Sequence, residues 1–143
     1  MATERKADVV WQGDLMNGSG TIGEVGSGAF GPLDVSWPSR AEEPNGKTSP
    51  EELIAAGWAA CFAMALSHGL AQAGNPPEKL ETSATVTFQP GEGIIKGALT
   101  VRGTVPGLDA DGFKDAANGA KENCPVSKAL AGIPEVTLEA TLA

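Results

Sequence analysis

Residues 53–66 form an alanine-rich segment that is apolar or small at every position. Strong helix-start signals precede it: Ser49 as the N-cap, Pro50 at the first helical position and Glu52 completing a capping box. The helix is expected to end at Gly74, before two prolines. A helix without a polar face is expected to be buried all round. Because a chain of 143 residues is too small to surround such a helix easily, we expect a sheet on one side and a second subunit on the other.

The same segment is too short to span a bilayer, which needs about 20 apolar residues. No charged region followed by an apolar stretch stands at the N-terminus, so no secretory signal is expected. The net charge of −8 argues against nucleic acid and against an anionic membrane as partners, because both require a basic surface. We therefore expect a soluble, cytoplasmic protein.

The flanking segments indicate strands and two further helices. Before the long helix, strands are expected at residues 7–11, 18–25 and 33–37, followed by a polar loop over residues 38–47. After it, the pattern predicts strands at 83–88 and 94–105 joined by a Gly91-Glu92-Gly93 turn, helices at 109–123 and 124–130, and a final strand at 136–142. The order β-β-β-α-β-β-α-α-β predicts an α+β fold with a mostly antiparallel sheet. The length predicts a single domain over residues 1–143.

The chain has two cysteines, Cys61 and Cys124. In a cytoplasmic protein, a redox or catalytic pair is a better interpretation than a structural disulfide. Cys61 lies in the middle of the apolar helix, where a small buried side chain is the alternative. Cys124 directly precedes Pro125 at an expected helix N-terminus, where unpaired N–H groups favour a thiolate, and a plain capping residue is the alternative. A disulfide between the two would close a loop of about 60 residues.

Two separate motifs carry a resemblance to a known family. The first runs from Arg40 through Ser-Pro-Glu-Glu-Leu at residues 49–53 to Ala-Ala-Cys-Phe-Ala-Met-Ala-Leu at residues 59–66. The second is Asn-Cys-Pro-Val-Ser-Lys-Ala-Leu at residues 123–130. Both resemble the cysteine motifs of the OsmC/Ohr family of organic-hydroperoxide reductases, in the family's order and spacing. The position of Arg40, just before the long helix, resembles the OsmC branch.

The resemblance implies a thiol peroxidase that acts in stress defence without a metal or an organic cofactor. Cys61 would attack the peroxide O–O bond and become a sulfenic acid, and Cys124 would resolve it to an intramolecular disulfide. Arg40 would stabilise the Cys61 thiolate, and Glu51 would orient Arg40. A dithiol such as a dihydrolipoyl group would reduce the disulfide. The resemblance also implies an intertwined homodimer with active sites at the subunit interface.

Physical reasoning tests these roles at two points. The electrostatic field at a helix N-terminus, taken by itself, predicts a lower pKa for the Cys124 thiol than for the Cys61 thiol. Glu51 precedes Cys61 by ten residues, or about 15 Å of helical rise. An Arg40 held by Glu51 of its own chain would struggle to reach Cys61 of that chain. Two antiparallel helices from two subunits would solve this, because the start of one then lies beside the middle of the other.

Three further residues of the long helix, Trp58, Met64 and His68, lie within two helical turns of Cys61. Trp58 and Met64 lie three positions on either side of Cys61 and are interpreted as walls of an apolar pocket for an alkyl group, with core packing as the alternative. His68 is about 10 Å beyond Cys61 along the helix and is expected to be structural or solvated. No pair of ligands has metal-site spacing.

Two hypotheses of different classes remain at this stage. One is a two-cysteine peroxidase for organic and, more slowly, inorganic hydroperoxides. The other is a non-enzymatic redox switch or ligand-binding dimer with the same fold. The joint presence of Arg40, Glu51, Cys61 and Cys124 favours the peroxidase, because a binding module has no reason to keep all four.

Overall fold

The computed structural model describes all residues, 1–143, and divides into two compact units, Met1–Leu53 and Ile54–Ala143. Helix α2 (Pro50–Gln72) begins in the first unit and continues through the second. The chain contains two three-stranded sheets and four helices. This mixed architecture confirms the predicted α+β class.

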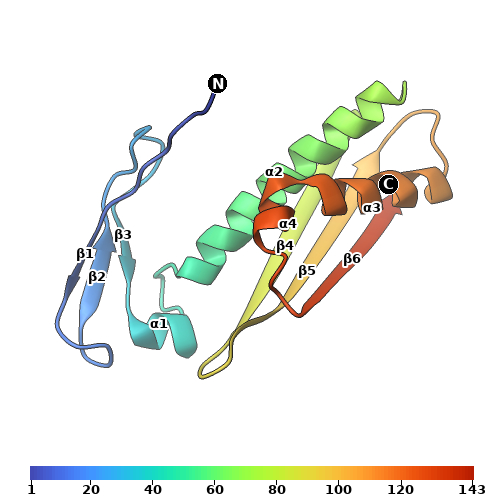
Figure 1. Ribbon diagram of the computed structural model, residues 1–143. Coiled ribbons are helices and arrows are strands. Elements are labelled where there is room, and N and C mark those ends of the chain that lie inside the picture. The colour runs from blue at the N-terminus through green and yellow to red at the C-terminus, as the bar shows by residue number, and fades with distance from the viewer. The chain divides into compact units, whose positions relative to one another are not determined.

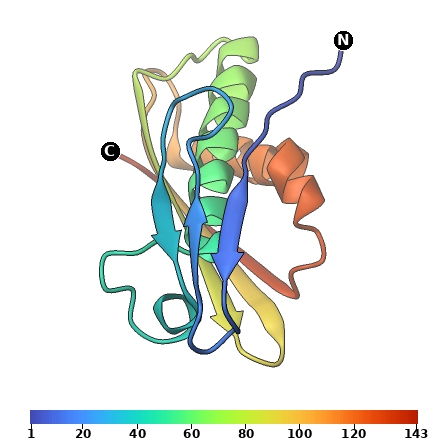
Figure 2. The same ribbon diagram turned by 90° about the vertical axis from the view of Figure 1, so that its left-hand side faces the viewer.

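The first unit contains one small antiparallel sheet in the order β1-β2-β3 (Figure 2). Its strands are β1 (Val9–Gln12), β2 (Ser19–Ile22) and β3 (Leu33–Val35), so the three predicted strands exist but are shorter than expected. Ile22 is the one apolar side chain of this unit that is buried. The sheet therefore has almost no core of its own.

A short helix, α1 (Trp37–Ala41), replaces the end of the predicted third strand and the start of the predicted loop, and that expectation was wrong. The cause is a reciprocal capping box. The Ser36 hydroxyl accepts from the Ser39 backbone N–H at 3.2 Å, and the Ser39 hydroxyl accepts from the Ser36 backbone N–H at 3.0 Å. Pro38 fits because its fixed φ suits the first helical turn. Arg40 consequently lies in the last turn of a helix and not in a loop.

The long helix α2 begins as predicted. The Ser49 hydroxyl accepts from the Glu52 backbone N–H at 3.1 Å, which satisfies one of the unpaired N–H groups of the first turn. The Glu52 carboxylate accepts from the Thr48 hydroxyl at 2.9 Å, so the second half of the expected capping box is made with a neighbouring residue. The N-terminus of α2 is thereby fixed by side chains on both sides of the cap.

The second unit has a sheet in the order β4-β5-β6, formed by β4 (Lys79–Gln89), β5 (Gly93–Thr104) and β6 (Glu135–Leu142). The β4–β5 hairpin is antiparallel and turns through residues 90–92, within one residue of the predicted turn. Strand β6 runs parallel to β5, so the chain must cross over between them through α3 (Ala110–Asn123) and α4 (Pro125–Ala129). Three of the four strand pairings in the chain are antiparallel, which confirms the prediction.

The core of the second unit lies between this sheet and helices α2 and α3 (Figure 1). The α2 ring of Trp58 packs on Gly97 of β5 and the α3 ring of Phe113 packs on Gly103, where an added Cβ would lie 2.5 and 2.6 Å from ring carbons. Both helices therefore cover the same face of β5, because residues 97 and 103 are an even number apart. The buried side chains of α2 recur every four residues: Trp58, Phe62, Leu66 and Leu70.

Helix α2 is not buried all round within one chain, and the side that its sheet leaves open is the side for which a second subunit is predicted. The sheet covers only the stripe just described, and the opposite side, at Ala56, Gly57, Ala60 and Met64, is exposed. The side chain of Met64 is 71% exposed although it lies only two residues from fully buried Phe62. The helix thus has an apolar face that its own chain leaves open.

Helix α2 is 23 residues long, and by length and composition alone it is able to cross a membrane. The helix ends at Gln72, close to the predicted end at Gly74, and its apolar part is longer than the 14 residues from which a membrane span was judged too short. The core helix of a soluble protein meets the same criteria, and this helix supplies the buried stripe of the second unit.

Candidate active site

The two cysteines meet although they are 63 positions apart in the chain. Cys61 lies on α2, and Cys124 ends α3 and begins α4 as its N-cap. Their sulfur atoms are 2.8 Å apart, and both thiols are free. The crossover between β5 and β6 brings the start of α4 against the middle of α2. This arrangement allows a disulfide to form after small adjustments of the two side chains.

The environments of the two thiols differ. Cys124 is fully buried, whereas Cys61 is partly exposed. Burial and the contact with Cys124 raise the pKa of the Cys61 thiol, although the Val126 backbone N–H opposes this. For Cys124, burial also favours the neutral thiol, but hydrogen bonds from Cys61, Ser127 and Val126 outweigh it and lower the pKa. The more acidic thiol is therefore Cys124, as helix-end electrostatics suggested, and the more accessible thiol is Cys61.

Trp58 is connected to the second cysteine motif by a hydrogen bond that the sequence analysis did not anticipate. Its indole Nε1–H donates to the Ser127 hydroxyl at 2.8 Å. The ring is only 1% exposed and packs in the core. The serine lies three residues after Cys124, and no local sequence signal reveals its partner, because the bond joins positions 69 apart in the chain.

The two residues interpreted as pocket walls do not lie together. Trp58 faces the core, whereas Met64 points to the open side of α2. The two residues are six positions apart, which places them about 120° apart around the helix, so equal spacing from Cys61 does not put them on one face.

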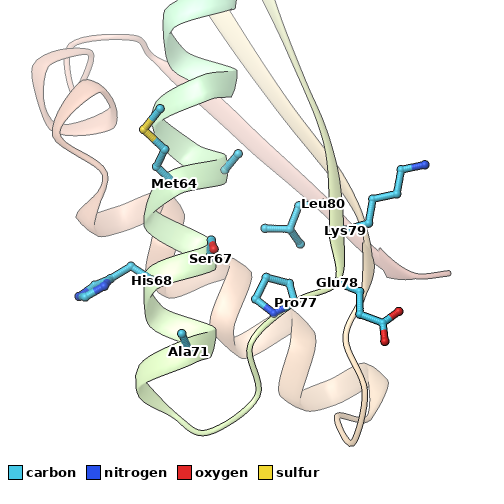
Figure 3. Close-up of a pocket in the computed structure, with 9 residues that line it drawn as sticks. Met64, Ser67, His68, Ala71, Pro77, Glu78, Lys79 and Leu80 are labelled. Atoms are coloured by element: carbon cyan, nitrogen blue, oxygen red, sulfur yellow. The ribbon is translucent and has the colours of Figure 1, made fainter.

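Met64 borders a shallow groove of about 660 Å³ between the second half of α2 and the start of β4 (Figure 3). Pro77 and Leu80 form its opposite side, and exposed His68 also lines it. Neither cysteine is among the lining residues. The groove therefore has a mixed lining, with Glu78 and Lys79 beside the apolar residues, and it is separate from the thiol pair.

Arg40 and Glu51 form a close ion pair within the first unit. The Arg40 Nε and Nη2 atoms donate to the Glu51 carboxylate at 2.9 and 2.8 Å, in a bidentate arrangement. The Glu51 side chain is 8% exposed and the Arg40 side chain is 32% exposed. The Trp37 ring lies 5.9 Å from the Arg40 guanidinium carbon. Glu51 thus holds Arg40 of its own chain.

No group of three or more His, Cys, Asp or Glu side chains is placed to hold a metal ion.

Comparison with known proteins adds to this geometry. A family model described as OsmC-like protein matches residues 43–139. Peroxiredoxin OsmC of Escherichia coli (strain K12) is 39% identical over 142 residues, which cover 97% of this chain and 96% of that protein. The chain belongs to the OsmC-like family. The matched range includes Glu51, Cys61 and Cys124, and Arg40 lies three residues before it. The family resemblance seen in the two cysteine motifs is thereby confirmed.

Other members of this family show the same similarity. Organic hydroperoxide resistance protein OhrB of Bacillus subtilis (strain 168) is 36% identical over 109 residues, covering 75% of this chain and 79% of that protein. The crystal structure of an organic hydroperoxide resistance protein OsmC from Legionella pneumophila aligns with a TM-score of 0.68 and 27% identity, over 96% of each chain. The OsmC-like family thus accounts for both the sequence and the fold.

Proposed function

We propose that this OsmC-like chain is a thiol-dependent peroxidase that reduces organic hydroperoxides through Cys61 and Cys124. The observation that carries the proposal is the contact between two free thiols, 2.8 Å apart. The proposal is supported by relatives named peroxiredoxin and organic hydroperoxide resistance protein. Contacting thiols from two distant motifs suit a cycle in which one sulfur is oxidised and the other resolves it.

The cycle has three balanced steps. The Cys61 thiolate attacks the terminal peroxide oxygen, the O–O bond breaks, and the alkoxide takes a proton to leave as an alcohol. The resulting sulfenic acid is attacked by the Cys124 thiolate, which forms the disulfide and releases the hydroxyl as water. A dithiol, of which a dihydrolipoyl group is one example, then exchanges with the disulfide and returns both cysteines to thiols.

Access assigns the attacking role to Cys61. The pKa of the Cys124 thiol is the lower of the two, but this side chain is fully buried. A peroxide therefore meets the Cys61 sulfur before it can reach the Cys124 sulfur. A buried acidic thiol next to the oxidised one is suited to resolution, because the thiolate is the attacking species.

The raised pKa of Cys61 requires a cation to activate it. Arg40 is the candidate, but its own Glu51 holds it near the start of α2, about 15 Å of helical rise from Cys61. We infer a homodimer in which the open apolar faces of two α2 helices pack antiparallel, so that Arg40 of the partner subunit serves Cys61. The exposed side at Ala56, Gly57 and Ala60 supports this packing, because small residues let two helices approach closely.

Organic hydroperoxides are expected to react faster than hydrogen peroxide, because a site at the border between two packed apolar α2 faces offers contacts to an alkyl group. Each buried methylene contributes about 0.8 kcal/mol, so a few carbons add about one to two orders of magnitude in kcat/KM. Steady-state rates with cumene hydroperoxide and hydrogen peroxide, with dihydrolipoamide as the reductant, measure this ratio. Equal rates would contradict the apolar substrate site. The free thiols also suit a reducing compartment, and we propose the cytoplasm.

The alternative, a redox switch or ligand-binding dimer without enzymatic turnover, shares the thiol pair and is separated by one experiment. Cys61→Ser and Cys124→Ser proteins each receive one equivalent of cumene hydroperoxide, and intact mass is measured with and without dimedone. We expect sulfenate only in Cys124→Ser, and an intramolecular disulfide in the wild type. Sulfenate on Cys124 of Cys61→Ser at the wild-type rate would reverse the roles. If neither the wild type nor either variant consumes the peroxide, the peroxidase proposal is wrong and the alternative of a redox switch or ligand-binding dimer is favoured.

A further inference from the structure

We propose that Trp58 and Ser127 form a hydrogen-bond relay to the sulfur of Cys124, and that this relay prepares the second thiol for disulfide exchange. Its place in the catalytic cycle rests on the proposed peroxidase function. The relay itself concerns only the thiol pair and can be tested without a peroxide. Both residues are positioning residues, because they act through Cys124.

The direction of the relay follows from the chemistry of its groups. An indole Nε1–H is a donor only, so in the 2.8 Å bond the Ser127 hydroxyl oxygen must accept. The hydroxyl proton is then free to point at another acceptor. The Cys124 sulfur lies three residues earlier, at the start of the same helix, and we assign it as that acceptor because the Ser127 side chain acts on this thiol. The sequence of donation is indole to hydroxyl to sulfur.

The first member of the relay is held rigidly. The Trp58 ring is 1% exposed and packs so closely on Gly97 that a Cβ there would lie 2.5 Å from two ring carbons. Trp58 also lies one helical turn before Cys61 on α2. The bond to Ser127 therefore fixes the start of α4, and with it Cys124, against the turn of α2 that carries Cys61.

The relay offsets the cost of burying Cys124. A buried sulfur without donors would remain a neutral thiol, which is a poor nucleophile. Hydrogen bonds to a thiolate stabilise the reduced pair, whereas a disulfide sulfur is a weak acceptor and gains little from them. The relay is therefore expected to speed attack on the Cys61 sulfenic acid and to make the resulting disulfide easier to reduce.

Thiol–disulfide equilibrium with reduced and oxidised dithiothreitol, at one fixed pH, tests the relay without peroxide. Ser127→Ala should shift the equilibrium toward the Cys61–Cys124 disulfide by about fivefold to tenfold, the size expected for the loss of one hydrogen bond of ordinary strength. Ser127→Thr keeps the hydroxyl and should restore the wild-type ratio, since Ser127 is partly exposed and leaves room for a methyl group.

A merely structural role predicts the opposite sign. If Ser127 only holds the two sulfurs near each other, Ser127→Ala shifts the equilibrium toward the thiols. A shift of Ser127→Ala toward the thiols would overturn the relay, and so would no shift at all. A shift of Ser127→Thr as large as that of Ser127→Ala would also overturn it, because the hydroxyl would then make no difference. Thermal unfolding of each variant confirms that the proteins compared are folded.

A double-mutant cycle tests whether Trp58 acts through Ser127. Trp58→Phe removes the indole donor and should shift the equilibrium in the same direction as Ser127→Ala. The double variant should equal Ser127→Ala, because the second substitution then removes nothing further from the sulfur. Independent, additive shifts would contradict a relay.

The kinetic consequence separates this inference from the proposed function. After one equivalent of cumene hydroperoxide, the Cys61 sulfenate of Ser127→Ala should persist about fivefold to tenfold longer than that of the wild type. If the wild type forms no sulfenate, the peroxidase proposal fails while the equilibrium result still decides the relay. If sulfenate forms and its lifetime is unchanged in Ser127→Ala, the relay does not assist resolution and the inference fails.

Discussion

The two units of the chain differ in how they obtain their stability. In the second unit, Ile54–Ala143, two helices and a sheet enclose a continuous core that includes fully buried Phe62 and Phe113. The first unit, Met1–Leu53, buries only Ile22 among its apolar side chains. Seven of the eight large apolar residues exposed in the structure belong to this unit: Met1, Val9, Val10, Trp11, Leu15, Met16 and Phe30.

This contrast extends to the chemistry. The second unit, which has its own core, carries the thiol pair, and the first unit carries the Arg40–Glu51 ion pair. A three-stranded sheet needs an apolar surface to pack against if it is to be stable. We interpret the first unit as dependent on a partner, so that dimerisation would stabilise it and deliver Arg40 to a thiol at the same time.

The largest expected effect concerns the core. Phe62→Ala should lower the free energy of unfolding by about 3–5 kcal/mol, because it leaves a cavity between α2 and the sheet. The matched substitution in the other unit is Phe30→Ala, at a side chain that is 45% exposed. Phe30→Ala should lower the free energy of unfolding by less than about half of the loss caused by Phe62→Ala. Urea unfolding of both variants at one protein concentration measures the difference, and equal losses would abolish the contrast between the units.

Arg40→Ala should lower the rate of Cys61 oxidation by about tenfold to a thousandfold, because a nearby cation shifts the pKa of an acid by about one to three units. Loss of the cation disfavours the thiolate, so the alkylation rate of Cys61 should rise only at higher pH than in the wild type. The measurement is iodoacetamide labelling of the Cys124→Ser background across pH, with and without Arg40→Ala. Identical pH profiles with and without Arg40→Ala would show that Arg40 does not lower the pKa of the Cys61 thiol.

Glu51→Ala should produce a smaller version of the same defect, about tenfold or less, because the charge of Arg40 remains while its bidentate anchor is lost. Stopped-flow oxidation of Cys61 compares the two variants directly. A loss greater than that of Arg40→Ala would show that Glu51 does more than orient the arginine.

Much of this arrangement could be predicted from sequence because the signals are local. The N-cap at Ser49, the turn at residues 90–92 and the helix after Asp109 follow from capping and turn residues within a few positions. The two cysteines and Arg40 were identified from motifs. Helix α1 was missed because Trp37 continued a strand-like alternation while the Ser36–Ser39 capping box was overlooked.

The remaining features depend on contacts between distant segments. The apolar composition of α2 does not tell which side its own sheet covers, and the structure shows that Trp58 is inside while Met64 is outside. The bond from Trp58 to Ser127 joins helices separated by two strands, so no periodicity reveals it. The parallel pairing of β6 likewise depends on the crossover and not on the pattern within the strand.

Subunit complementation tests the central claim most directly. Arg40→Ala and Cys61→Ser chains, whose homodimers are expected to be slowed and inactive respectively, are co-expressed with different affinity tags, and the mixed dimer is purified. If Arg40 of one subunit serves Cys61 of the other, the mixed dimer contains one intact site of two and should show about half of the wild-type peroxidase rate. If Arg40 serves Cys61 of its own chain, no intact site exists in the mixed dimer. A rate no higher than that of the Arg40→Ala homodimer would contradict the account.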